Sequence, residues 1–118
     1  MPKEYISYLE TILQECKDIE TMKEKGLSYE DLLNNVEKKK ALMYSVLNVG
    51  EYSSKIPADV KLKWSELEWV KMVGLRNRIA HDYLGVDLRI VWKIAKYDIP
   101  KLIPQIEKVL EVEKKQKD

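Results

Sequence analysis

The chain has 118 residues, which is the usual length of one domain, so we expect a single domain over residues 1–118. Its hydrophobic residues, 45% of the total, are enough to form one core. Its 21 basic and 20 acidic residues leave a formal net charge of +1, so overall charge does not indicate a nucleic-acid-binding protein. One cysteine and one histidine exclude an intrachain disulfide and do not make a zinc site, so we expect neither a metal nor a cofactor.

The lone cysteine, Cys16, falls on the apolar face of a predicted helix, so we expect a buried thiol in a reducing cytoplasm. No apolar run approaches the roughly 20 residues that span a bilayer. The first residues lack the basic and then apolar pattern of a signal peptide. We therefore expect a cytoplasmic protein that does not contact a membrane.

The first predicted helix covers residues 3–25. Gly26 follows its lysine-rich last turn and predicts its end, because glycine readily adopts the left-handed conformation that terminates helices. Ser28 and Asp31 have the spacing of a capping box, which predicts a short helical turn from residue 28 onwards. The apolar residues that share one face of the first helix are Tyr5, Leu9, Ile12, Cys16 and Ile19.

A second long helix is predicted for residues 36–54. Gly50 lies inside it, and an internal glycine costs a helix about 1 kcal/mol relative to alanine. Close approach of another helix is the expected compensation. Pro57 interrupts the helical pattern, so we expect an irregular connection up to Trp64.

A third helix is predicted for residues 64–82, with its end marked by Gly85. Asp87 is a suitable N-cap for a fourth helix, and Asp98 for a fifth.

Pro104 should kink the fifth helix or delay its start, because proline cannot donate the backbone hydrogen bond. The charged residues 113–118 are expected to fray. No segment alternates with period two, so the sequence predicts an all-α fold, a compact antiparallel bundle of about five helices.

The third helix becomes polar towards its end. One stripe at helical spacing runs through Leu67, Val70, Gly74, Asn77 and His81. Arg76 lies on the neighbouring stripe, so we expect Arg76, Asn77 and His81 to converge on one anion. The residues expected to face the core are Met72, Leu75 and Ile79, and those expected to face solvent are Lys71, Arg78 and Asp82.

These side chains could cleave a phosphodiester without a metal. The imidazole of His81 can transfer protons near neutral pH, and Arg76 can neutralise charge on a phosphate. Asn77 could position an oxygen or the imidazole. One histidine does not readily act as both acid and base, so two copies in a two-fold dimer would be needed. The alternative from the residues alone is a structural histidine with an arginine that interacts favourably with a helix C-terminus.

Residues 76–83, Arg-Asn-Arg-Ile-Ala-His-Asp-Tyr, resemble the R-N-x-x-A-H-x-Y signature of HEPN domains. The chain is most similar to their HepT-like toxin branch. The resemblance continues through residues 84–87 and 90–92, and upstream through residues 26–30 and 48–51. It departs where Lys63-Trp64 replaces a common proline-tryptophan pair, and at residues 51–53, where small alanines are common.

The resemblance implies a two-fold dimer and a metal-independent endoribonuclease with a composite site in a cleft at the dimer interface. It implies that Arg76 and His81 are the catalytic pair and that Asn77 supports them. The residues implied to contact the RNA are Arg76, Asn77, Arg78 and Tyr83.

Members of this branch act as toxins of type II or type VII HEPN/MNT toxin–antitoxin pairs. The resemblance therefore implies a minimal nucleotidyltransferase partner that neutralises the chain by transferring AMP to Tyr83. We expect Tyr83 to be exposed at the cleft edge. The alternatives are a non-catalytic subunit that binds a nucleotide or substrate for a two-component nucleotidyltransferase, and a dimeric helical adaptor.

Overall fold

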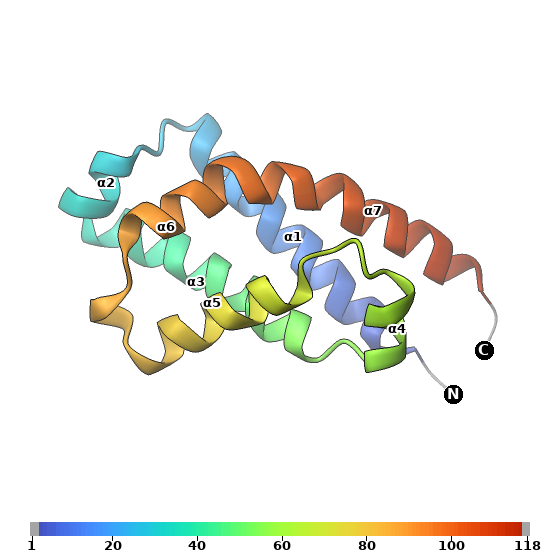
Figure 1. Cartoon of the computed structure of the whole chain (residues 1–118). Helices are drawn as coiled ribbons and strands as arrows, with labels where there is room; N and C mark the ends of the chain where they lie inside the picture. The colour runs from blue at the N-terminus through green and yellow to red at the C-terminus, as the bar shows by residue number, and fades with distance from the viewer. Residues whose placement is uncertain (1–2, 117–118) are drawn as a thin grey trace.

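A computed structural model describes residues 3–116, and in this range the backbone is helical and contains no strand, as predicted. Four long helices run in alternating directions, with α1 between α3 and α7, and α3 between α1 and α5 (Figure 1). The elements are α1 (Glu4–Glu24), α2 (Tyr29–Asn34), α3 (Val36–Ser54), α4 (Ala58–Lys63), α5 (Trp69–His81), the 3-10 turn η1 (Tyr83–Gly85), α6 (Leu88–Lys93), the π-helical turn η2 (Ile94–Asp98) and α7 (Ile99–Lys115). The antiparallel bundle is as predicted, but within residues 3–116 the short helices α2, α4 and α6 accompany the four long ones, which is more than the five or so helices expected.

Local signals placed the first two long helices correctly. Helix α1 matches the prediction within one residue at each end, and α3 matches it fully. Gly26 follows α1 with a φ of 97°, the left-handed conformation that favours glycine. The capping box is confirmed, since the Asp31 backbone N–H donates to Ser28 Oγ and the Ser28 N–H donates to the Asp31 carboxylate.

The connection expected to be irregular contains a helix. Helix α4 follows Pro57, and the third long helix, α5, begins at Trp69 rather than at Trp64. The Trp64 carbonyl accepts hydrogen bonds from the Leu67 backbone N–H at 3.2 Å and from Trp69 Nε1 at 3.0 Å. These contacts close a turn before α5, so Leu67 is buried in that turn and does not extend the predicted stripe.

The fifth predicted helix begins directly after Asp98, as expected, but the predicted cap by the Asp98 side chain is wrong. Helix α6, η2 and α7 follow one another without a loop, and the Asp98 side chain does not cap α7. Its carboxylate instead accepts from Lys71 Nζ of α5 at 2.8 Å. Pro104 does not delay α7, which begins at Ile99. Helix α7 reaches Lys115, so fraying from residue 113 is also wrong, while residues 117 and 118 lie outside the described range.

Gly50 marks the contact between α3 and α5. A Cβ at Gly50 would collide with the Cβ of Arg76 and lie 2.6 Å from the carbonyl oxygen of Met72. The predicted close helix approach is therefore confirmed, and the partner helix is α5.

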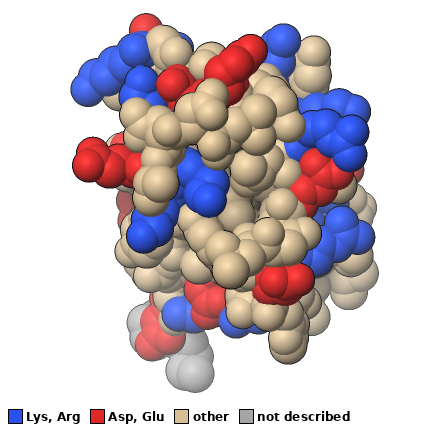
Figure 2. Space-filling view, turned by 90° about the vertical axis from the view of Figure 1, so that its left-hand side faces the viewer, with Lys and Arg blue, Asp and Glu red and all other residues tan. Residues whose placement is uncertain are grey.

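The end of the bundle that carries α2, α6 and η1 has no surface of a single charge. Figure 2 shows lysine or arginine side chains interspersed with aspartate or glutamate around an uncharged centre. This distribution agrees with the near-zero formal net charge of +1.

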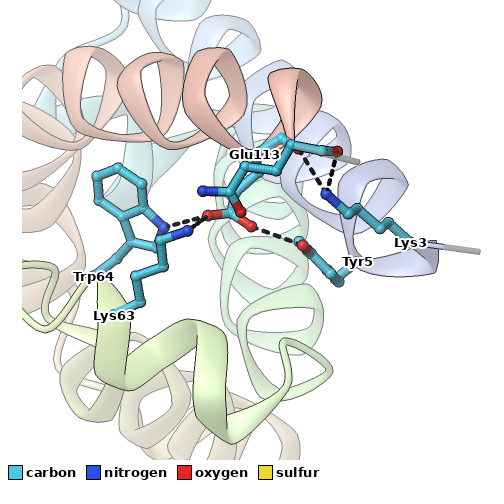
Figure 3. A network of polar contacts seen from close by, with 6 residues as sticks. Lys3, Tyr5, Lys63, Trp64 and Glu113 are labelled. Atoms are coloured by element: carbon cyan, nitrogen blue, oxygen red, sulfur yellow. Dashed lines mark hydrogen bonds and ion pairs between the residues drawn. The ribbon is translucent and has the colours of Figure 1, made fainter. Parts of the chain in front are cut away.

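A buried carboxylate joins α7 to α1 and α4 at the other end of the bundle (Figure 3). Glu113, only 2% exposed, accepts from Tyr5 Oη at 2.7 Å, from Trp64 Nε1 at 2.9 Å and from Lys63 Nζ at 2.9 Å. Burial alone raises the pKa of this carboxyl, but the hydrogen bonds from Lys63, Tyr5 and Trp64 outweigh it. The pKa of Glu113 is therefore lowered from its ordinary value.

Candidate active site at the end of helix α5

The outer face of α5 is exposed near both ends of the helix and half-buried at Gly74 between them. Val70 near its start is 88% exposed, and Asn77 and His81 are exposed near its end. Leu75 and Ile79 on the inner face are buried, which confirms the predicted core side of this helix. Met72 is partly buried, and the predicted solvent-facing residues Lys71, Arg78 and Asp82 are exposed.

Arg76 is held by two side-chain contacts. Its Nε donates to Glu51 Oε1 of α3 at 2.7 Å, and its Nη1 donates to Asn77 Oδ1 at 2.7 Å. The Arg76 side chain is 34% exposed. The structure therefore brings Arg76 and Asn77 together at the surface, with their polar groups in contact.

His81 is the last residue of α5, and its imidazole is exposed without a hydrogen bond to any described residue. The chain turns directly after it, because the Asp82 carboxylate accepts from the Gly85 backbone N–H at 3.0 Å. A Cβ at Gly85 would collide with that carboxylate, so a larger residue at this position would displace the Asp82 side chain from this hydrogen bond. His81 lines a hollow of about 370 Å³ between this turn and α6, together with Leu75, Arg78, Asp82, Val86 and Ile90.

The expected convergence of Arg76, Asn77 and His81 on one anion is only partly met within one chain. Arg76 and His81 are five positions apart, which separates them by about 140° around the helix axis. No hydrogen bond or ion pair links His81 to Arg76 or Asn77 among the described residues. The arginine faces α3, whereas the histidine faces the turn towards α6.

Tyr83 differs from its expected exposure. The side chain is partly buried, and its hydroxyl is enclosed without a hydrogen-bond partner among the described residues. The ring lines a hollow against α3 and has the Lys39 ammonium 5.6 Å from its centroid. The turn that the Asp82 carboxylate holds brings the ring onto α3, and the sequence pattern did not reveal this.

Comparison with known proteins identifies the family. A family model described as ribonuclease HepT-like matches residues 4–109. The chain belongs to the HepT-like family. It is 35% identical to "Putative RNase TTE0752" of Caldanaerobacter subterraneus subsp. tengcongensis, over 91% of this chain and 95% of that protein. It is 34% identical to "Probable ribonuclease HepT" of Thermococcus cleftensis, over 92% of this chain and 98% of that protein.

A third HepT-like relative is "Putative RNase MJ1216" of Methanocaldococcus jannaschii, 36% identical over 93% of this chain and 91% of that protein. No solved structure matches the chain. The family resemblance noted for residues 76–83 is thus confirmed for almost the whole length of the chain.

The sequence did not predict two residues that contact side chains of the signature segment 76–83. Glu51 binds Arg76, and Lys39 lies over the ring of Tyr83. A signal was present for Glu51, because it follows the glycine that predicts close helix contact. An acidic side chain next to such a contact can reach the facing helix. No comparable signal marks Lys39, one of three consecutive lysines.

The described residues offer four kinds of functional group at the end of α5: a guanidinium, a carboxamide, an imidazole and a phenol. Within residues 3–116, no three or more His, Cys, Asp or Glu side chains are grouped to hold a metal ion. Over the same range, none of the helices has the length and apolar character needed to cross a bilayer.

Proposed function

We propose that this chain is a metal-independent endoribonuclease, the toxin of a HEPN/MNT toxin–antitoxin pair. The observation that supports it most is the placement of Arg76, Asn77 and His81 on the accessible end of α5 in a chain of the ribonuclease HepT-like family. A guanidinium grips phosphate through paired N–H groups, and an imidazole exchanges protons near neutral pH. RNA is the substrate that both groups and the family favour.

In the proposed reaction, a ribose 2′-oxygen attacks the adjacent phosphorus and the bond to the leaving 5′-oxygen breaks. His81 accepts the 2′-hydroxyl proton as general base, or donates a proton to the leaving oxygen as general acid. Arg76 neutralises the charge that grows on the non-bridging oxygens of the pentacoordinate phosphorus. The two proton transfers need two imidazoles, so a second copy of the chain supplies the other.

A homodimer built on the outer face of α5 would meet that requirement. This face begins with the exposed Val70 and continues past Gly74, where an added Cβ would have no atom within 4 Å. Open apolar and small residues are suitable for contact with a second helix. An arginine and a histidine on separate sides of one helix can reach the same phosphate when each comes from a different copy.

We also propose that a minimal nucleotidyltransferase acts as the antitoxin by transferring AMP to Tyr83. The tyrosine oxygen would bond to the α-phosphorus of ATP, with loss of its proton and release of pyrophosphate. The new phosphodiester adds negative charge and bulk beside the site, which is a physical reason for inhibition. Because the Tyr83 hydroxyl is enclosed, the transfer requires the η1 turn to move away from α3.

The hollow beside Tyr83 favours one second candidate, a subunit that binds a nucleotide for a nucleotidyltransferase partner without cleaving RNA. This hollow of about 300 Å³ is lined by Lys40, Tyr44 and Tyr83 among others, which combines a cation with aromatic rings. Such groups can bind the phosphate and the base of a nucleotide. Saturable ATP binding by a chain that does not cleave RNA would favour this role.

The experiment is RNA cleavage by the purified chain, with intact-mass measurement showing an unmodified Tyr83, in the presence of EDTA. We expect cleavage that His81→Ala and Arg76→Ala each reduce at least about 100-fold. Arg89→Ala is the matched control, because the Arg89 guanidinium is bound to Asp87 within its own helix turn. Full activity of the His81 and Arg76 variants, or loss of cleavage with EDTA, would contradict the proposal.

A further inference from the structure

The Glu51 carboxylate lies directly against the proposed catalytic arginine. Its Oε1 accepts from Arg76 Nε at 2.7 Å, across the contact between α3 and α5. Both side chains are 34% exposed, so the pair lies at the surface that RNA would approach. The mechanism proposed above gives Glu51 no role.

The backbone contact at Gly50 places Glu51 within reach of Arg76. A side chain at Gly50 would collide with the Cβ of Arg76. Because glycine has no side chain, α3 can contact α5 at the position of Arg76. The next residue along α3 then reaches the guanidinium. Helix packing therefore fixes the Cβ of Arg76, and Glu51 binds its guanidinium.

The hydrogen bonds of Arg76 leave part of its guanidinium available to RNA. A guanidinium carries five N–H donors. Glu51 takes the donor on Nε, and Asn77 takes one of the two on Nη1. One Nη1 proton and both Nη2 protons have no partner among the described residues, so three donors remain for phosphate oxygens.

We infer that Glu51 is a positioning residue that orients Arg76 for the scissile phosphate. This inference rests on the proposed ribonuclease function. A long arginine side chain loses rotamer entropy when it is held in one orientation, and an arginine held before the substrate arrives does not lose that entropy during the reaction. The carboxylate also repels the RNA phosphate in the ground state. Glu51 therefore acts on kcat and does not improve KM.

The test compares Glu51→Gln with Asp98→Asn in the full chain. Asp98→Asn is a matched control, because it breaks another carboxylate contact to α5, from Lys71 to Asp98 at 2.8 Å, at a similar 33% exposure. We expect Glu51→Gln to lower kcat about tenfold, with KM unchanged or lower. We expect Asp98→Asn to retain kcat. Glu51→Asp, which keeps the charge on a shorter side chain, should recover part of the lost kcat.

A second readout does not depend on activity. The Arg76 Nε–Hε signal in a nitrogen–proton NMR spectrum, assigned by its loss in Arg76→Lys, should exchange slowly with water in the native chain. Glu51→Gln should accelerate that exchange, and Asp98→Asn should not. Glu51→Ser provides a second variant without a carboxylate if Glu51→Gln does not fold.

Unchanged kcat in Glu51→Gln overturns the inference. An increase in kcat also overturns it, since Glu51 would then compete with the phosphate for Arg76. If His81→Ala and Arg76→Ala abolish cleavage while Glu51→Gln is fully active, only the role of Glu51 fails. If those two variants remain active, the ribonuclease proposal fails, and the NMR readout still decides whether Glu51 holds Arg76.

Discussion

Replacement of Glu113 by glutamine tests whether one buried charge fastens α7 to α1 and α4. The carboxylate is 2% exposed and accepts from Tyr5, Trp64 and Lys63. Glutamine keeps the shape of the side chain, removes the charge and turns one acceptor oxygen into a donor nitrogen. The three donors would then face a neutral and partly mismatched group.

These contacts set the expected decrease in the free energy of unfolding. A hydrogen bond to a charged acceptor is worth roughly 1 kcal/mol more than one to a neutral acceptor. The bonds from Tyr5 and Trp64 lose this difference in full, whereas Lys63, at 43% exposure, loses less because water screens its ion pair. We expect the free energy of unfolding to fall by about 2 to 3 kcal/mol. At roughly 4 °C per kcal/mol for this length, the melting temperature should fall by about 10 °C.

The assay is urea denaturation followed by helical circular dichroism at pH 7.5, at one fixed protein concentration in case the chain self-associates. Glu111→Gln is the matched control on the same helix, because the Glu111 side chain is 67% exposed and, among residues 3–116, is paired only with Lys115. It should change the free energy of unfolding by less than about 0.5 kcal/mol.

The pH dependence gives a second check on the same variant. The pKa of Glu113 is lowered in the folded chain because the hydrogen bonds from Lys63, Tyr5 and Trp64 outweigh the effect of burial, which acts in the opposite direction. Its stabilisation is therefore complete above the unfolded pKa of about 4.3 and is lost as pH falls through the lower folded pKa. The gap between the native chain and Glu113→Gln should narrow over that acidic range. Equal stability of Glu113→Gln and Glu111→Gln at pH 7.5, or a gap that does not narrow in acid, would refute the reasoning.

Three further predictions follow from other parts of the bundle. Gly50→Ala should destabilise the chain by about 1 to 3 kcal/mol in urea denaturation, because its Cβ would collide with Arg76, whereas Gly74→Ala, with no atom within 4 Å, should not. Burial raises the pKa of Cys16 to about 12, so a thiol reagent at pH 8 should label it only after unfolding, and rapid native labelling would contradict this burial. Tyr83→Phe should leave stability unchanged or raise it by up to about 1 kcal/mol, because the enclosed hydroxyl has no described partner, and a clear loss of stability would reveal a bond that this structure lacks.

Much of the architecture was predictable from the sequence because its determinants are local. The capping box at Ser28, the glycine at position 26 and the apolar spacing of α1 and α3 act within a few residues of one another. The buried side of α5 followed from the same spacing. Residues 76–83 pointed to the HepT-like family, and the family match over residues 4–109 bears this out.

What only the tertiary structure decided depends on residues far apart in the chain. Glu51 reaches Arg76 because Gly50 lets two helices touch, and Glu113 draws on donors from α1 and from α4. The enclosed hydroxyl of Tyr83 depends on how the turn after α5 packs against α3. Local periodicity carries no information about such contacts, since the orientation of each side chain is set by the element packed against it.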